Sequence, residues 1–425
     1  MLTSTILPLA LAGAAASMIP SASASPVQLA GQAPSVNGPD GNLSHEALER
    51  SFKQAVERSV AQFSARSVQD DKDCPTTRQR SRKVKRGSRA IPLVNSGFAY
   101  LAQASIGTPA QTVALQIDTG SGDLLVPRAT DDLTPEQGGF VASKSRTFRK
   151  GDGVEIPFTF AGGSANGVVV ADKVQLGGFI KIAQPFGLIE PTYVPFGILG
   201  LSFSSIAKIQ GQPTFFDRLR SENQLDRNLF GLYHTRDGAS GSELTLGAAD
   251  SSRYTGELTT IPVVSQTHWT VQMNHATLDG EVVYDGPVFT AVDSGTTTTI
   301  IPKAITDAYF ARIPGSVANP EHNVTTTISG QQVVGQIYEY PCNATLPVPG
   351  FIFEGSDKIF QTDVEDAAIA QPNAKPGDLC VSSMVGADVI YYGQKAALIG
   401  LPFLKSWYSV FNFDDATVSF AAAKH

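Results

Sequence analysis

One short pattern occurs twice in this chain and restricts its fold more than any other feature. "QIDTGSG" at 116–122 and "AVDSGTT" at 291–297 each end an apolar, strand-like run in Asp, a small hydroxyl residue, Gly and a second hydroxyl residue. Each half also has an apolar-apolar-Gly strand, "FGILGLSF" at 196–203 and "AALIGLPF" at 396–403. A pattern doubled in this way predicts two lobes of similar fold that face each other.

The two aspartates of this pattern are the candidate catalytic residues. Asp118 and Asp293 each lie where a buried strand runs into a glycine turn, a place where a single Asp is most often only a turn former. If the lobes pack about an approximate twofold axis, the two carboxylates become neighbours and share one proton at acid pH. Such a pair is an acid and a base at once, which suits the addition of water to an amide carbonyl without a metal or other cofactor. The alternative is two similar glycine turns in a β protein.

The residues that follow each Asp are predicted to support it. The glycines let the backbone bend close to the carboxylates. The first hydroxyl residue of each turn can reach across the axis and lock the opposite turn, and the second can donate to an outer carboxylate oxygen. These supporting residues are Thr119, Gly120, Ser121, Ser294, Gly295 and Thr296.

The beginning of the chain has the features of a secretory signal. Residues 1–24 hold an apolar stretch from Ile6 to Ile19, then Ala22 and Ala24 at the spacing that signal peptidase prefers. The alternative is an ordinary apolar helix. No later apolar run is long enough to cross a bilayer, so we expect a secreted, extracellular protein without a membrane anchor.

Residues 25–86 are predicted to be a propeptide. The segment ends in the basic run "RQRSRKVKRGSR", in which Lys85-Arg86 is a candidate site for a dibasic-cutting protease; the alternative is a solvated or nucleic-acid-binding tail. Residues 1–86 carry a net charge of +4, which leaves −11 on the rest of a chain whose total is −7. An acidic body would attract its own basic propeptide, as in a zymogen, and has no charge excess suited to nucleic acid.

The remaining residues are predicted to form a mainly β body of two lobes, at 87–250 and 251–425. A chain of 425 residues with 42% hydrophobic and 17% charged residues is globular and exceeds what one core usually organises. The sequence of this body consists of short runs of β-branched and aromatic residues, which are interrupted by Gly, Pro, Asn and Asp. Helices are expected at 213–225 and 302–313, each opened by a proline.

The paired D-[TS]-G-[ST] turns and their apolar-Gly strands resemble those of the pepsin-like aspartic protease family. The resemblance runs from "YLAQASIGTPAQTVALQIDTGSGDLLVP" to "KSWYSVFNFDDATVSFAAA", nearly all of the body. It implies a bilobal β fold around a deep cleft and a monomeric endopeptidase that works at acid pH. Its substrate would be an extended polypeptide held partly by strand-like hydrogen bonds. The alternative is a pepsin-fold protein that binds a partner and is catalytically weak or inactive.

Three positions depart from the family pattern, and one of them is Leu401 in "LIGLPF", where members usually have Asp. The other two concern the flap. Members usually place a Tyr on a hairpin flap over the cleft and a Trp soon after the first Asp turn, where this chain has Phe160 and Leu125. Because both polar tips are missing together, no donor is orphaned. We expect Phe160 to cap a substrate pocket by apolar contact on a mobile flap that includes Gly162; the alternative is that Phe160 is plain hairpin core.

Cysteines and glycosylation motifs complete the prediction. Cys342 and Cys380 can close one disulfide loop, leaving Cys74 unpaired. Sequons occur in the body at Asn323 and Asn343, which the secretory route would make glycosylation sites. By resemblance, a single bridge together with a dibasic propeptide is most similar to secreted fungal members of the family.

Overall fold

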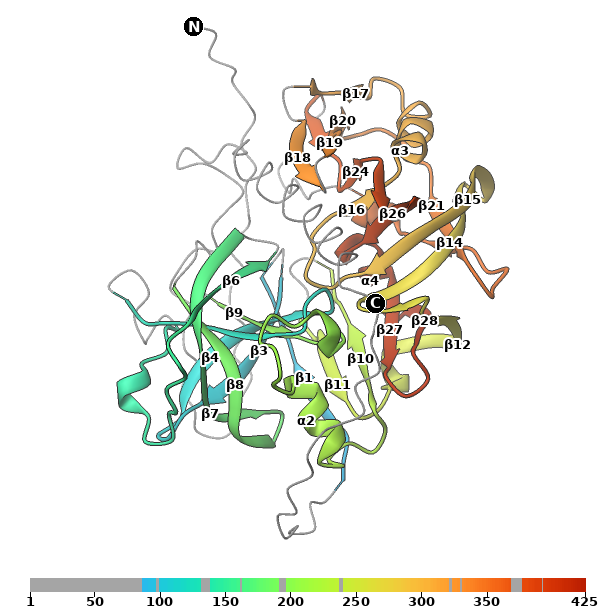
Figure 1. The fold of residues 1–425 in the computed structure, drawn as a ribbon. Coiled ribbons are helices and arrows are strands. Elements are labelled where there is room, and N and C mark those ends of the chain that lie inside the picture. Colours follow the sequence, from blue (N-terminus) through green and yellow to red (C-terminus); the bar gives the residue numbers. More distant parts are fainter. Residues whose placement is uncertain are drawn as a thin grey trace, which may run out of the picture.

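The structure is a computed structural model that describes residues 86–96, 99–130, 138–160, 163–190, 196–236, 240–320, 323–328, 331–367, 377–391 and 393–425. The predictions for the signal segment, for the propeptide up to Lys85, for Cys74 and for Gly162 fall outside these residues. The described chain is mainly β, as the sequence predicts, and its strands form the sheets of two lobes and one sheet to which both halves contribute (Figure 1).

The N-terminal lobe is built on a sheet in the strand order β2-β3-β4-β9-β5-β8-β7-β6, with a further pairing between β3 and β7. Two of its strands, β5 and β9, are buried along their whole length, which explains why they hold no charged residue. Its strands are β2 (Val94–Asn95), β3 (Tyr100–Ile106), β4 (Gln111–Asp118), β5 (Leu124–Pro127), β6 (Glu155–Phe160), β7 (Gly163–Leu176), β8 (Phe179–Ile189) and β9 (Gly197–Gly200).

The C-terminal lobe repeats this plan in the strand order β22-β21-β14-β15-β26-β16-β24, with β13 beside β14 and β25 beside β26. Its strands are β13 (Ser265–Gln266), β14 (Trp269–Leu278), β15 (Glu281–Val292), β16 (Thr299–Ile301), β21 (Pro349–Phe353), β22 (Phe360–Gln361), β24 (Met384–Gly386), β25 (Val389–Tyr391) and β26 (Gln394–Ile399). Smaller sheets are formed by β17 (Val317–Ala318), β20 (Tyr338–Pro341) and β23 (Leu379–Val381), and by β18 (Val324–Ile328) and β19 (Gln331–Gly335).

A third large sheet, which we call the shared sheet, draws strands from both halves of the chain in the order β1-β11-β10-β27-β28-β12. Its strands are β1 (Arg89–Pro92), β10 (Leu229–Tyr233), β11 (Glu243–Leu246), β12 (Tyr254–Pro262), β27 (Trp407–Asn412) and β28 (Thr417–Ala423). In Figure 1 β10 and β27 run side by side between the two lobes, and their pairing joins residues that are far apart in the sequence, such as Phe230 and Phe411.

Helices are short and lie outside the sheets. The structure has α2 at Phe215–Ser221, α3 at Lys303–Phe310 and α4 at Leu401–Ser406. Two of these fall within the helices expected from the sequence, and α2 opens with the hydroxyl of Thr214 accepting from the amide of Asp217. Single 3-10 turns occur at Ala142–Lys144, Ser204–Ile206, Ser251–Arg253 and Val364–Asp366.

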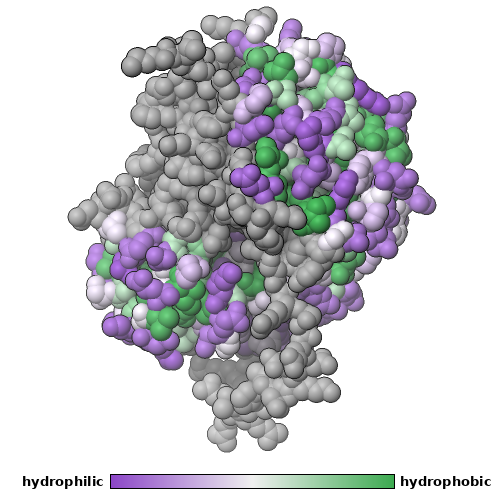
Figure 2. All heavy atoms as spheres, turned by 45° about the horizontal axis from the view of Figure 1, so that its top comes forward, coloured by the Kyte–Doolittle hydropathy of each residue, from purple (hydrophilic) through white to green (hydrophobic). Residues whose placement is uncertain are grey.

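An aromatic cluster forms the core where the two lobes meet the shared sheet. Phe203 packs on Trp269 with ring centroids 4.5 Å apart, and Phe230 stacks on Phe411 at 4.8 Å. Because these rings come from both halves, their burial contributes to the association of the lobes. On the outside, Figure 2 shows hydrophilic and hydrophobic residues interspersed over the described part of one face. None of the helices in the described chain is both long and apolar enough to cross a membrane.

Candidate active site

Matching strands carry the two predicted catalytic residues. Asp118 is the last residue of β4, and Asp293 directly follows β15. The apolar-Gly strand β9 pairs in parallel with β4, and β26 pairs in parallel with β15. Each therefore lies directly beside the strand that leads into one Asp turn. A side chain at Gly200 would come within 2.6 Å of turn backbone, and one at Gly400 within 2.3 Å. Glycine recurs at the end of both strands because only it allows this approach.

The turn of the N-terminal lobe holds its carboxylate by two short hydrogen bonds. The amide of Gly120 donates to Asp118 Oδ1 at 2.8 Å, and the hydroxyl of Ser121 donates to Oδ2 at 2.6 Å. Behind the turn, the amide of Leu201 donates to the carbonyl of Asp118, and the indole of Trp269 donates to the carbonyl of Leu201. Side chain and backbone of Asp118 are therefore both fixed.

The turn of the C-terminal lobe holds its carboxylate by the same pair of hydrogen bonds. The amide of Gly295 donates to Asp293 Oδ1 at 2.7 Å, and the hydroxyl of Thr296 donates to Oδ2 at 2.7 Å. The amide of Leu401, where family members usually have Asp, donates to the carbonyl of Thr296 at 2.9 Å. A leucine serves here because the contact uses its backbone, while its side chain is buried.

Two hydroxyl groups join the turns across the lobe boundary. Thr119 Oγ1 donates to the carbonyl of Val292 and accepts from the amide of Ser294, both at 2.9 Å. In the equivalent contacts from the other lobe, Ser294 Oγ donates to the carbonyl of Ile117 at 2.9 Å and accepts from the amide of Thr119 at 3.1 Å. All four bonds are buried, where unmade hydrogen bonds are costly, so they hold the two turns in one register.

Both carboxyl groups lie against the same glycine. Gly120 donates to Asp118, and a Cβ placed on Gly120 would lie 2.6 Å from Cγ and both carboxyl oxygens of Asp293. Asp118 and Asp293 are both buried. Two buried carboxyl groups in such proximity can supply one acid and one base to the same reacting centre.

The position where a Trp is usual lies in a small apolar cluster beside the first turn. Leu125 on β5 is buried with Phe158, Ala165, Ile189, Ile198 and Ile209. Phe160 is the last residue of β6 and pairs with Gly163 at the tip of the β6–β7 hairpin. The hairpin expected from the sequence is thus present.

Asp123 is a site neighbour that sequence reasoning missed. Its carboxylate accepts from the amides of Lys208, at 2.7 Å, and Ile209, at 3.1 Å, and so holds the segment that packs on Leu125. Burial raises the pKa of Asp123 above its usual range, although these two amides oppose the rise. The available signal was an acidic residue directly before the fully apolar run "LLVP".

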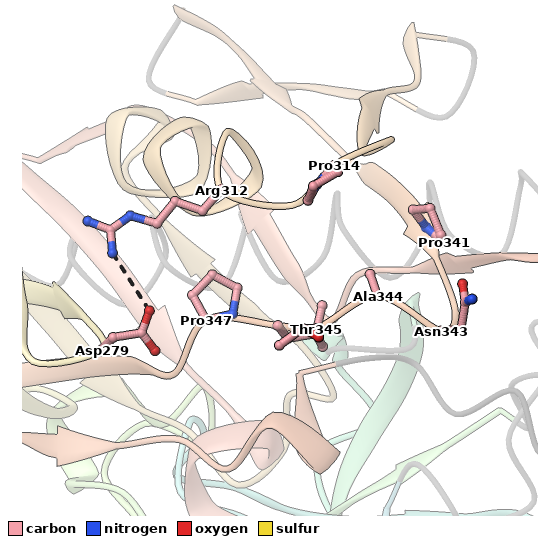
Figure 3. A pocket seen from close by; sticks show the side chains of 9 residues that line it. Asp279, Arg312, Pro314, Pro341, Asn343, Ala344, Thr345 and Pro347 are labelled. Carbon is pink, nitrogen blue, oxygen red and sulfur yellow. Dashed lines mark ion pairs between the residues drawn. The ribbon is translucent and has the colours of Figure 1, made fainter.

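The cysteines and sequons of the body lie on the C-terminal lobe. Cys342, which directly follows β20, forms a disulfide with Cys380 on β23. Asn343 is exposed and lines a surface hollow of about 610 Å³, in which Arg312 and Asp279 form an ion pair (Figure 3). This hollow shares no lining residue with the two Asp turns.

Comparison with known proteins gives a consistent result. A family model described as eukaryotic aspartyl protease matches residues 99–423. Pepsin A of Sus scrofa is 30% identical over 323 residues, covering 74% of this chain and 78% of the relative. The pregnancy-associated glycoprotein of Equus caballus is 30% identical over 77% of this chain and 81% of its own length. Cathepsin E-B of Xenopus laevis is 28% identical over 78% and 81% of the two chains.

Proposed function

The chain belongs to the eukaryotic aspartyl protease family and is an aspartic-type endopeptidase, and we propose that Asp118 and Asp293 together are its catalytic dyad. One observation carries the proposal. The carboxylates lie on either side of Gly120, each held by a matching pair of hydrogen bonds, on turns that are joined across the lobe boundary. This arrangement gives both groups a fixed position toward one substrate carbonyl.

In the proposed mechanism the pair shares one proton and activates a water molecule. The ionised carboxylate takes a proton from water while the protonated one donates to the carbonyl oxygen of the peptide, and the new C–O bond gives a tetrahedral diol. The C–N bond then breaks as one carboxyl group gives its proton to the nitrogen and the other carboxylate takes a proton from a diol hydroxyl, which releases the amine and the carboxylic acid and restores the dyad with one shared proton. No covalent enzyme intermediate is involved. Since activity needs one protonated carboxyl group, we expect it at acid pH.

Supporting roles are proposed for the neighbours of the dyad. Gly120 and Gly295 donate to the inner carboxylate oxygens, whereas Ser121 and Thr296 donate to the outer ones. These donors favour a fixed orientation of each carboxyl group, and charge-assisted bonds of 2.6–2.8 Å are the stronger kind.

The substrate is proposed to be an extended polypeptide that contacts the β6–β7 hairpin. Phe160, Gly162 and Leu125 are the candidate substrate-binding residues on that side. Burial of Leu125 in an apolar cluster supports a flap region held by packing, where relatives of the family use a Tyr–Trp hydrogen bond. The same departure is the observation that favours the rival function, a pepsin-fold protein that binds a polypeptide without cleaving it.

We also propose that the protein is secreted as a zymogen and cut after Lys85-Arg86. Contacts of the first described residues support this cutting point. Arg86 donates to Asn223, Gly87 forms backbone hydrogen bonds with the 224–226 segment, and β1 then enters the shared sheet. The residues that follow the dibasic pair are therefore joined to the body and would stay with it after cleavage. The same proposal includes residues 25–86 as the propeptide, a monomeric mature protein, and glycans on Asn323 and Asn343.

The activity is tested with the processed protein. We expect hydrolysis of a denatured protein at pH 3–5 that is blocked by pepstatin and absent in Asp118→Asn. If no cleavage occurs after residues 25–86 have been removed completely, the dyad proposal is wrong and the binding function takes its place.

The route of activation is tested separately. N-terminal sequencing of an Asp293→Ala variant secreted by its native host distinguishes the two routes. Cleavage after Arg86 in this inactive variant shows that another protease acts, which we expect from the dibasic site. Accumulation of the uncut precursor shows that the protein activates itself.

A further inference from the structure

A second link between the two turns comes from Gln116, which the family pattern does not include. Gln116 is a polar residue in the apolar run of β4 and is buried, with 7% of its surface exposed. Its side-chain amide crosses the lobe boundary, and Nε2 donates to the carbonyl oxygen of Gly295 at 3.2 Å. This bond is separate from the four bonds of Thr119 and Ser294.

The acceptor of this bond is itself part of the C-terminal turn. Gly295 donates through its amide to Asp293 Oδ1 at 2.7 Å. Gln116 therefore holds, from the N-terminal lobe, the residue that holds one carboxyl group of the opposite lobe. The position that corresponds to Gln116 in the second turn is Ala291, two residues before Asp293, whose side chain has no polar atom. The support is thus one-sided in a site that is otherwise doubled.

We propose that Gln116 is a positioning residue that fixes the carboxyl group of Asp293 through Gly295. The inference rests on the proposed function, because it assigns Gln116 to the orientation of a dyad member. A glycine peptide is the most easily rotated part of a turn, and a buried hydrogen bond to its carbonyl restricts that rotation. Even a small misplacement of a catalytic group lowers turnover strongly.

Two substitutions at this position separate positioning from mere packing. Gln116→Leu removes the donor and keeps the volume. Gln116→Glu offers a conditional donor: its neutral carboxyl group can donate to the Gly295 carbonyl, whereas the ionised form cannot and adds a charge near Asp118 and Asp293. The state of Glu at this position therefore depends on pH.

Gln111 provides a matched control on the same strand. Its side chain donates to the carbonyl of Val141 at 3.0 Å and accepts from the amide of Val141 at 2.9 Å, away from the two turns. Gln111→Leu and Gln111→Glu alter part-buried side-chain hydrogen bonds within the N-terminal lobe. Kinetics are measured on the processed protein, with active molecules counted by pepstatin titration.

We expect Gln116→Leu to lower kcat about tenfold with KM within about twofold, while Gln111→Leu leaves both unchanged per active molecule. For Gln116→Glu, kcat stays near the wild-type value on the acid side, and the alkaline limb of the kcat profile moves down by about one pH unit. Gln111→Glu keeps the wild-type limb.

The proposal is overturned if Gln116→Leu retains wild-type kcat, or if the alkaline limb of Gln116→Glu coincides with that of Gln111→Glu. A lower melting temperature without these kinetic changes would show that Gln116 has a purely structural role, and it would also overturn the proposal. The proposed function fails in a different way, through an inactive wild-type protein or an active Asp118→Asn variant.

Discussion

Asp118 and Asp293 are held alike, each by the amide of the glycine two residues on and by the hydroxyl three residues on. The surroundings of the two turns differ. Gln116 extends from the N-terminal lobe toward the second turn, whereas Ala291 occupies the matching place, and the apolar cluster around Leu125 lies on the N-terminal side. Twofold matching is kept where two equivalent carboxylates are needed. It is lost in two places where we propose that the lobes have different roles. One is the support of the second turn by Gln116, and the other is the region around Leu125 that is proposed to contact substrate.

The largest expected effect concerns the equivalence of the carboxylates. Asp118→Asn and Asp293→Asn should each lower kcat/KM by about 10³-fold or more, because an amide can neither take up nor share the proton. Initial rates on a quenched peptide at pH 4 measure this. A single variant that keeps a tenth of the wild-type rate would show that one lobe carries the chemistry alone.

The next effect tests the hydroxyl link between the lobes. Thr119→Val and Ser294→Ala each remove one donor and one acceptor from buried cross-lobe bonds, so each should lower the free energy of unfolding by about 2 kcal/mol. Denaturant titration at pH 5 compares them, with Ser265→Ala, whose hydroxyl contacts Thr267 within the C-terminal lobe, as control. A large cost for one substitution and none for the other would break the symmetry of the link.

A smaller effect lies at an ionic contact near the shared sheet. Arg236, which follows β10, pairs with Asp363 at 2.8 Å and with Asp366 at 3.2 Å in the other half of the chain. Burial raises the pKa of Asp366 to about 6, a rise that Arg236 and Lys405 oppose. The folded state thus binds a proton that the unfolded state releases near pH 4. The stability contribution is full below pH 4 and is lost as pH rises to about 6.

We therefore expect Asp366→Asn to match the wild type at pH 4 and to be more stable by about 3 kcal/mol at pH 7. Melting temperatures measured from pH 4 to pH 7 follow the difference. Asp363 pairs with the same arginine, Arg236, as Asp366 does, so Asp363→Asn is the control for the loss of an ion pair. A constant offset between Asp366→Asn and the wild type over this range would contradict the assignment.

The smallest expected effect is on the substrate side. Phe160→Tyr alone should change kcat/KM about two- to tenfold, because a new hydroxyl enters an apolar flap without the Trp that relatives of the family provide. Profiling of cleavage sites on a peptide library detects the accompanying change in preference. Unchanged turnover and preference would remove Phe160 from the flap and leave it as hairpin core.

Much of the site was predictable because most of its residues belong to the two short D-[TS]-G-[ST] motifs. The turns, the apolar-Gly strands and the reach of Thr119 and Ser294 all follow from residues close to each Asp in the sequence. Gln116 and Asp366 were missed because their partners lie 179 and 130 residues away and no local motif marks them. Single polar residues in apolar runs, such as Gln116 in "TVALQI", are the signal that deserved more weight.

The fold shows the same division between local and distant causes. The helix expected at 213–225 ends at Ser221, because Asn223 adopts a left-handed φ of 51° and Leu225 forms a bridge with Gly87 instead. Likewise, the shared sheet depends on pairing between strands from both halves, which periodicity within one strand does not reveal.

The central claim, that two turns form one site, is tested most directly by a double-mutant cycle. kcat/KM is measured for the wild type, Asp118→Asn, Asp293→Asn and the double variant, with active-site integrity checked by melting temperature. The account predicts that the double variant is no worse than either single one by more than about tenfold, because each substitution alone already disables the pair. Losses that multiply would contradict it, since they would mean that the two carboxylates act independently.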